Sequence, residues 1–163
     1  MTEFGDQIAD PTGPDLIRLA RSVEPLVEFV DPSSEAELSA AEAVLGFGLP
    51  GQLRSFLLES DGATVAVRLS SGALVEKASP LVWPLSEIVL ANQGFRVHPE
   101  QGPGGVLCFA NAGFDGILFG HQLEGASPRS EVVAWYPYDG RIEAFAPSFA
   151  RYLVGWLAGD LSI

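Results

Sequence analysis

The chain contains little positive charge, which argues against several classes of partner. Its 163 residues include 9 Lys and Arg against 21 Asp and Glu, for a net charge of −12. Such a negative field repels the phosphates of nucleic acids and the anionic surfaces of membranes, so we expect direct binding to neither. It attracts basic proteins, although the same charge also simply keeps a protein soluble.

Cysteine and long apolar runs are also scarce. Cys108 is the only cysteine, so no internal disulfide can form, which is typical of a reducing compartment. No segment approaches the roughly 18 uninterrupted apolar residues that would predict a membrane-spanning helix. Residues 1–15 are acidic overall, and they have neither the basic nor the apolar part of a signal peptide. These absences predict a soluble, cytoplasmic protein.

The residues that are present have the composition of a folded protein. Hydrophobic residues make up 47% of the chain and charged residues 18%, so a core can form without disulfides or metals. The length fits one domain. Residues 1–13 contain Pro11 and Gly13 and show no periodicity, so we expect a mobile leader there and one domain over residues 14–163.

The N-terminal part is predicted to be helical as far as Gly62. Apolar residues at helical spacing run from residue 16 to 27, and Pro25 ends or kinks that helix. Ser34 and Glu37 have the spacing of a capping box that opens a second helix. A third helix is predicted over residues 49–62, with Gly62 as a left-handed cap at its end.

From residue 64 onward the pattern indicates mainly strands. Segments 64–69 and 73–76 are predicted to form a hairpin, and Ser86 to cap a short helix through Leu90. Four more strands are predicted, at residues 106–111, 116–122, 132–137 and 141–145. An Asp-Gly turn at residues 138–140 joins the last two of these strands.

The C-terminal segment returns to a helical pattern. Pro147-Ser148 opens this helix, whose apolar stripe runs from Phe149 to Leu157. Helices at both ends of the chain with strands between them predict an α+β fold. We expect the helices to pack on a mainly antiparallel sheet of about five or six strands.

No residue pattern points to catalysis. Cys108 lies in an apolar run, where a free cysteine acts as a small hydrophobe. The available bases are His98 and His121, and the sequence leaves open whether either lies near Cys108. There is no G-x-S-x-G elbow and no Cys/His pair at zinc spacing. The glycines at 102–105 precede a strand, whereas a phosphate loop precedes a helix. We therefore expect no catalytic residues, no metal ligands and no cofactor.

Carboxylates and aromatic residues offer weaker signals. Nothing in the sequence brings any two of the carboxylates together for glycoside chemistry; they include Asp61, Asp115, Asp139 and Glu143. The densest aromatic stretch is residues 135–138. On a strand Trp135 and Tyr136 point to opposite faces, so one enters the core and the other meets solvent or a partner. Exposed Tyr and Trp favour interfaces, and packing on a sheet face is the alternative.

One ordered set of motifs runs through most of the chain. It comprises Glu42, Leu45-Gly46, Leu49-Pro50, Phe56-Leu57 and Asp61-Gly62, then segments 83–88, 106–116 and 147–153. This set resembles the signature of the SUKH superfamily, the Smi/Knr-type domains. Asp61-Gly62 stands where Asn-Gly is usual in that signature, and the resemblance covers about residues 35–158.

The resemblance implies an α+β domain that recognises proteins without catalysis. Most bacterial relatives are immunity proteins of polymorphic or contact-dependent toxin systems, and many of the toxins are nucleases. Together with the charge of −12, this predicts a cytoplasmic immunity protein that binds a basic toxin domain. The sequence leaves its oligomeric state open between a monomer, which we favour, and a homodimer through a strand edge. The alternatives are a regulatory or scaffolding module and, last, a small hydrolase or ligand-binding protein. The expected partner contacts, near the predicted sheet turns, are Asp115, Tyr136, Tyr138 and Asp139.

Overall fold

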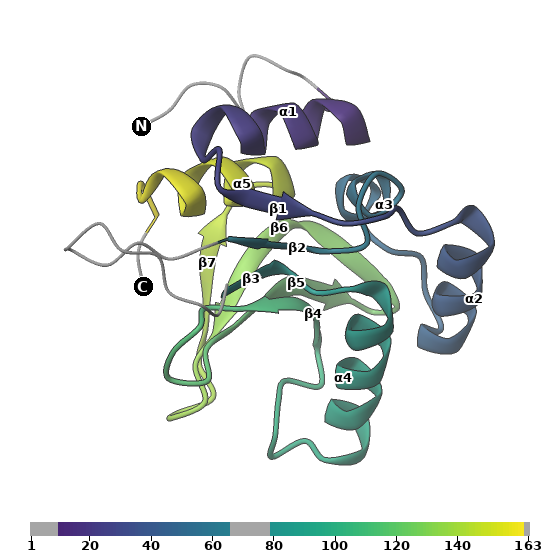
Figure 1. The fold of residues 1–163 in the computed structure, drawn as a ribbon. Coiled ribbons are helices and arrows are strands. Elements are labelled where there is room, and N and C mark those ends of the chain that lie inside the picture. Colours follow the sequence, from purple (N-terminus) through teal and green to yellow (C-terminus); the bar gives the residue numbers. More distant parts are fainter. Residues whose placement is uncertain (1–9, 66–78, 162–163) are drawn as a thin grey trace.

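Helices lie at both ends of the chain and two antiparallel sheets lie between them (Figure 1). The computed structural model describes residues 10–65 and 79–161. In chain order the elements are α1 (Gly13–Val23), β1 (Val27–Phe29), α2 (Glu35–Leu45), α3 (Gly51–Leu57), β2 (Ala63–Val65), β3 (Ser79–Val82), α4 (Leu85–Val97), β4 (Val106–Asn111), β5 (Leu118–Glu124), β6 (Ser127–Trp135), β7 (Ile142–Ala146) and α5 (Phe149–Ala158). The predicted α+β class and antiparallel pairing are confirmed.

The strands divide into a sheet of order β1-β2-β3 and a sheet of order β4-β5-β6-β7. The four strands of the second sheet lie within a few residues of the predicted positions. Of the predicted hairpin of segments 64–69 and 73–76, residues 64 and 65 lie in β2 and the rest lies outside the described residues. The Trp83 amide, just after β3, donates to the Phe109 carbonyl on β4 at 2.8 Å, so the two sheets meet there.

Capping boxes begin the first two helices. Ser34 Oγ accepts the Glu37 amide at 3.1 Å and the Glu37 carboxylate accepts the Ser34 amide at 3.1 Å, as the spacing predicted. Thr12 and Asp15 form the same arrangement at α1. Helix α1 therefore begins at Gly13, with Thr12 as its N-cap. Residues 1–9 lie outside the described part.

Three helix predictions were wrong in detail. Helix α1 does end before Pro25, with Glu24 as its C-cap, as predicted, but residues 27–29 form β1 rather than helix, because Val27 pairs with Val65 of β2. Helix α3 ends at Leu57; Gly62 does have a φ of 88°, but it lies beyond the helix, where a Cβ would meet the Val82 carbonyl at 2.8 Å. Helix α4 runs well past Leu90, and its cap is Pro84 rather than Ser86.

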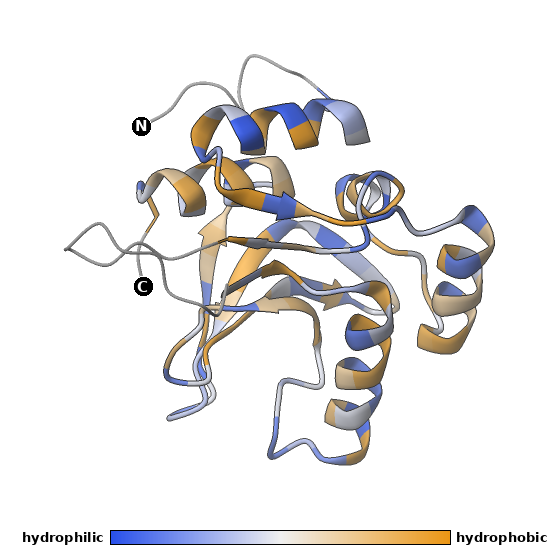
Figure 2. Cartoon of the chain, in the orientation of Figure 1, coloured by the Kyte–Doolittle hydropathy of each residue, from blue (hydrophilic) through white to orange (hydrophobic). Residues whose placement is uncertain are grey.

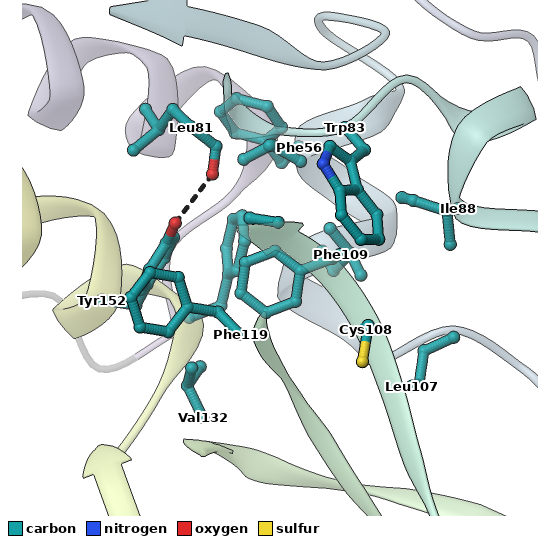
Figure 3. Packing of buried hydrophobic residues seen from close by; sticks show 14 of the residues in the cluster. Phe56, Leu81, Trp83, Ile88, Leu107, Cys108, Phe109, Phe119, Val132 and Tyr152 are labelled. Atoms are coloured by element: carbon teal, nitrogen blue, oxygen red, sulfur yellow. Dashed lines mark hydrogen bonds between the residues drawn. The ribbon is translucent and has the colours of Figure 1, made fainter. Parts of the chain in front are cut away.

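An aromatic cluster joins the last helix to the strands (Figure 3). Phe109, Phe119 and Tyr152 are fully buried, with Tyr152 5.0 Å from Phe109 and 5.2 Å from Phe119 between ring centroids. The Tyr152 hydroxyl donates to the Leu81 carbonyl at 2.8 Å, which ties α5 to β3. Helix α5 is mostly hydrophobic, whereas α1 alternates hydrophobic and hydrophilic residues (Figure 2). The predicted apolar stripe of the last helix thus forms part of the core.

Candidate functional site

The carboxylate of Glu42 joins two helices rather than forming a site. Its Oε2 accepts the Leu49 amide at 2.7 Å and its Oε1 accepts Arg54 Nε at 3.1 Å. Arg54 also pairs with Glu35 at 2.8 Å, and the hydrogen bonds to Glu35 and Glu42 raise the pKa of Arg54. Helix α3 has no side-chain cap of its own at Pro50, so Glu42 orders the loop that leads into it.

The carboxylate of Asp61 is used in the same way at α4. Its Oδ1 accepts the Leu85 amide at 2.7 Å and the Ser33 hydroxyl at 3.0 Å. Pro84 provides no side-chain cap, so Asp61 satisfies a free N–H at the positive end of the helix. An Asn carbonyl oxygen could accept the same two hydrogen bonds.

Asn92 is a buried polar residue that sequence reasoning missed. The register of β4 and β5 shifts between Cys108 and Ala110, which leaves a bulge in β4. Asn92 accepts the Cys108 amide at 2.9 Å and donates to the carbonyls of Cys108 at 2.8 Å and Ile88 at 2.7 Å. A signal was present: Asn92 falls on the apolar face of α4 that Leu85 and Ile88 begin.

Cys108 and the histidines do not form a nucleophile–base pair. Cys108 is fully buried, and burial raises the pKa of its thiol well above the usual range. His121 lies opposite Leu107 in the register, and its Nδ1–H donates to the Arg129 carbonyl at 2.8 Å. Burial lowers the pKa of His121 to about 4, so the ring is neutral at neutral pH. His98 is exposed and lies 3.4 Å from Glu100. The thiol has no base to activate it.

Metal-binding and membrane-spanning features were also sought among the described residues. Within residues 10–65 and 79–161, no three or more His, Cys, Asp and Glu side chains gather as metal ligands do. In that same part of the chain, no helix has the length and apolar character needed to cross a membrane.

Two turns meet at one end of the four-stranded sheet. The turn after β4 and the turn after β6 lie at the same end, because all four strands are antiparallel neighbours (Figure 1). At Gly116 in the first turn, a Cβ would lie 3.3 Å from Pro137 Cγ in the second, so the turns touch. They line a pocket of about 260 Å³ formed by Phe114, Asp115, Ile117, Tyr136, Pro137, Tyr138, Asp139 and Arg141. We call these eight residues the turn surface.

The structure brings the four predicted contact residues together on this turn surface. As strand alternation predicted, Trp135 is buried whereas Tyr136 is half-buried. The Gly140 amide donates to the Tyr136 carbonyl at 2.9 Å, which closes the second turn and leaves Tyr138 95% exposed at its tip. Phe114, which the sequence did not single out, is 52% exposed in the first turn. The surface therefore presents aromatic rings from both turns.

Charged groups on the turn surface differ in how they are paired. The Arg141 guanidinium lies 4.1 Å from the centroid of the Tyr136 ring, with Nε 3.0 Å from Glu143 and Nη1 3.7 Å from Asp139. No described residue donates a hydrogen bond to the carboxylate of Asp115 or forms an ion pair with it. Asp115 is thus an exposed anion beside exposed rings.

A second exposed apolar surface lies between α2 and α4. Its groove of about 550 Å³ is lined by Glu37, Ala40, Ala41, Asp61, Leu85, Ser86, Val89, Leu90 and Gln93, and Leu90 is 72% exposed. Both carboxylates of this groove already accept backbone amides, Glu37 from Ser34 and Asp61 from Leu85. The turn surface, in contrast, carries Asp115, whose carboxylate pairs with no residue that the structure describes.

Comparison with protein families shows the family of this chain. A sequence model of the SMI1 / KNR4 family (SUKH-1) matches residues 32–155, which include both motif carboxylates and the whole turn surface. No curated protein matches the chain.

Proposed function

The chain belongs to the SMI1 / KNR4 family (SUKH-1), and from this premise we propose that it is a non-catalytic immunity protein that binds and occludes a basic toxin. The family resemblance supports a role in protein recognition, and the net charge of −12 supports a basic partner. We place this action in the cytoplasm, where an imported toxin reaches its target. The observation that carries the proposal is the turn surface, with its exposed rings and the carboxylate of Asp115, which no described residue pairs with.

The turn surface has the composition of a binding site for a protein. Tyr and Phe side chains bury large areas at little cost in conformational entropy, and central aromatic residues often contribute about 2 kcal/mol or more to binding. Tyr138 and Phe114 are exposed in the free protein, so a partner that covers them gains most of this energy on association. The negative field of the chain accelerates the approach of a basic partner.

The chemistry of the buried groups supports binding rather than catalysis. Three titratable side chains have structural roles: His121 is neutral and buried, and Glu42 and Asp61 accept the backbone amides of Leu49 and Leu85. The pKa of the buried Cys108 thiol is raised, which opposes formation of a nucleophilic thiolate.

Co-expression with the toxin encoded beside the gene tests this proposal. We expect the wild-type chain to prevent killing and to co-purify with the toxin. A double variant, Phe114→Ala with Tyr138→Ala, should fold normally and lose both properties. Leu90→Ala is the control, because it removes an exposed apolar side chain from the other surface, with an exposed fraction of 72% against 52% for Phe114 and 95% for Tyr138.

The possible outcomes separate the alternatives. Killing that the wild-type chain does not change, together with no co-purification, refutes immunity. Capture of an unrelated cellular protein without protection would instead favour a regulatory or scaffolding module. Loss of protection in Leu90→Ala but not in the double variant would move the binding site to the groove between α2 and α4.

A further inference from the structure

The turn surface already holds one arginine of its own chain. Arg141 stacks on the Tyr136 ring at 4.1 Å while its guanidinium pairs with Glu143 at 3.0 Å and Asp139 at 3.7 Å. A planar guanidinium is suited to such a place, since it stacks on an aromatic face and pairs with carboxylates in its own plane. The ring and carboxylates of this half of the surface are therefore satisfied internally.

The other half of the surface has the same components without the arginine. Asp115 and the rings of Phe114 and Tyr138 line the same pocket of about 260 Å³. Phe114 is 52% exposed and Tyr138 is 95% exposed, and no described residue pairs with the Asp115 carboxylate. With Asp115, Asp139 and Glu143 against Arg141, the four charged groups carry a net charge of −2. This half of the pocket is complementary to a cation with a flat, weakly hydrated face.

We propose that this pocket binds an arginine side chain of the partner protein, with its guanidinium paired to Asp115 and stacked against Phe114 and Tyr138. The proposal deepens the proposed function and rests on it for the identity of the partner as a basic protein. Lysine fits less well, because its ammonium is a strongly hydrated point charge that neither stacks nor pairs in two directions. A second copy of the chain is a poor occupant, since each copy has a net charge of −12.

The test uses a small probe, Nα-acetyl-arginine amide, titrated into the ¹⁵N-labelled full-length chain and followed by amide chemical shifts. We expect saturable shifts confined to residues 113–117 and 136–141, with a dissociation constant of tens of millimolar, because a single exposed cation–π and ion-pair contact contributes little binding free energy. Nα-acetyl-lysine amide carries the same charge. At the same concentrations it should change the chemical shifts of these amides by no more than about half as much.

Variants assign the contacts. Asp115→Asn should weaken binding of the arginine probe about threefold to fivefold and Tyr138→Ala about threefold, without change in the fold. Glu28→Gln is the matched control, an exposed carboxylate on β1 outside the turn surface, and should leave binding unchanged. Arg141→Ala should tighten binding about twofold, because it frees Asp139 and the Tyr136 ring and removes a repelling cation.

Each contrary result overturns the inference. It is wrong if the arginine probe shifts no amides in the two turns, if the lysine probe binds equally well, or if Arg141→Ala weakens binding. These results are independent of the immunity test. If the chain protects against the toxin but does not bind the arginine probe, the proposed function stands and the arginine pocket is refuted. If the chain binds the probe but does not protect, the pocket stands and the immunity function is refuted.

Discussion

Asp61 and Asp115 have the same side chain but differ in their hydrogen bonds and exposure. Asp61 is half-buried, and its Oδ1 accepts the Leu85 amide and the Ser33 hydroxyl. Asp115 is exposed on the turn surface and has no internal partner among the described residues. The difference lies in the neighbouring backbone: a helix begins beside Asp61 and leaves an N–H that needs an acceptor, whereas no such donor lies beside Asp115. A carboxylate that accepts hydrogen bonds inside the fold is unavailable to a partner, so of these two residues Asp115 is the one we propose as a binding residue.

The internally used side chains should contribute most to stability, and Asn92 should contribute most of all. Asn92→Ala leaves the buried amide and carbonyl of Cys108 without partners, which should cost about 4 kcal/mol of unfolding free energy in urea denaturation. The control is Gln93→Ala, an exposed neighbour on the same helix, with an expected change below about 0.5 kcal/mol. Equal effects of the two variants would mean that the internal hydrogen bonds do not stabilise this fold.

Protonation of His121 should produce the next largest effect. Burial lowers its pKa from 6.5 to about 4, so the unfolded chain takes up the proton first as the pH falls. The stability is fully present above pH 6.5 and should fall by about 3 kcal/mol on the way to pH 4, a value obtained from the pKa difference at 1.36 kcal/mol per unit.

Urea unfolding at pH 7 and at lower pH measures this dependence. His121→Gln should remove the part of the slope that one histidine proton contributes, whereas His98→Gln, at an exposed histidine, should keep it. A wild-type slope that survives in His121→Gln would assign the acid sensitivity to the carboxylates instead.

Substitution of Asp61 measures how much its internal hydrogen bonds contribute to stability. Asp61→Ala removes the acceptor of the Leu85 amide and of the Ser33 hydroxyl, and should lower the unfolding free energy by about 2 kcal/mol. Asp61→Asn retains a carbonyl acceptor and should cost no more than about 0.5 kcal/mol. If Asp61→Asn were as damaging as Asp61→Ala, the charge rather than the hydrogen bonds would be essential.

The same change at Asp115 should have the smallest effect on stability. Asp115→Asn should alter the unfolding free energy by less than about 0.5 kcal/mol, because no described residue depends on this carboxylate. Thermal and urea unfolding beside Asp61→Ala give the contrast in one experiment. A large loss of stability in Asp115→Asn would place Asp115 among the structural carboxylates and remove it from the turn surface as a binding residue.

Local patterns predicted many of the secondary elements. The capping box of Ser34 and Glu37, the Asp-Gly turn after β6 and the apolar stripe of α5 act over a few residues, and each is present. Elements that depend on distant partners were missed or misplaced. Residues 27–29 become a strand only because β2 lies beside them, and β3 was not predicted at all.

The candidate site was predicted in part. Asp115, Tyr136, Tyr138 and Asp139 were expected near the sheet turns, and the structure places all four in one pocket, while their role as partner contacts stays a prediction. Phe114 was not singled out, because exposure of an isolated Phe in a turn has no pattern along the chain. The sequence did not predict the hydrogen bonds of Asn92 and His121 for a related reason. Each side chain bonds to a backbone group near a bulge or register shift, and such irregularities have no pattern along the chain.

The sequence by itself determined the acidic charge, the α+β class and the family resemblance that the family model then matched over residues 32–155. These properties follow from composition and from patterns between near neighbours in the chain. Only the tertiary structure decided which carboxylates accept hydrogen bonds inside the fold and which stay exposed without a partner among the described residues. That distinction depends on where unpaired backbone donors lie in space, and it separates Asp61 from Asp115 although the residues are chemically identical.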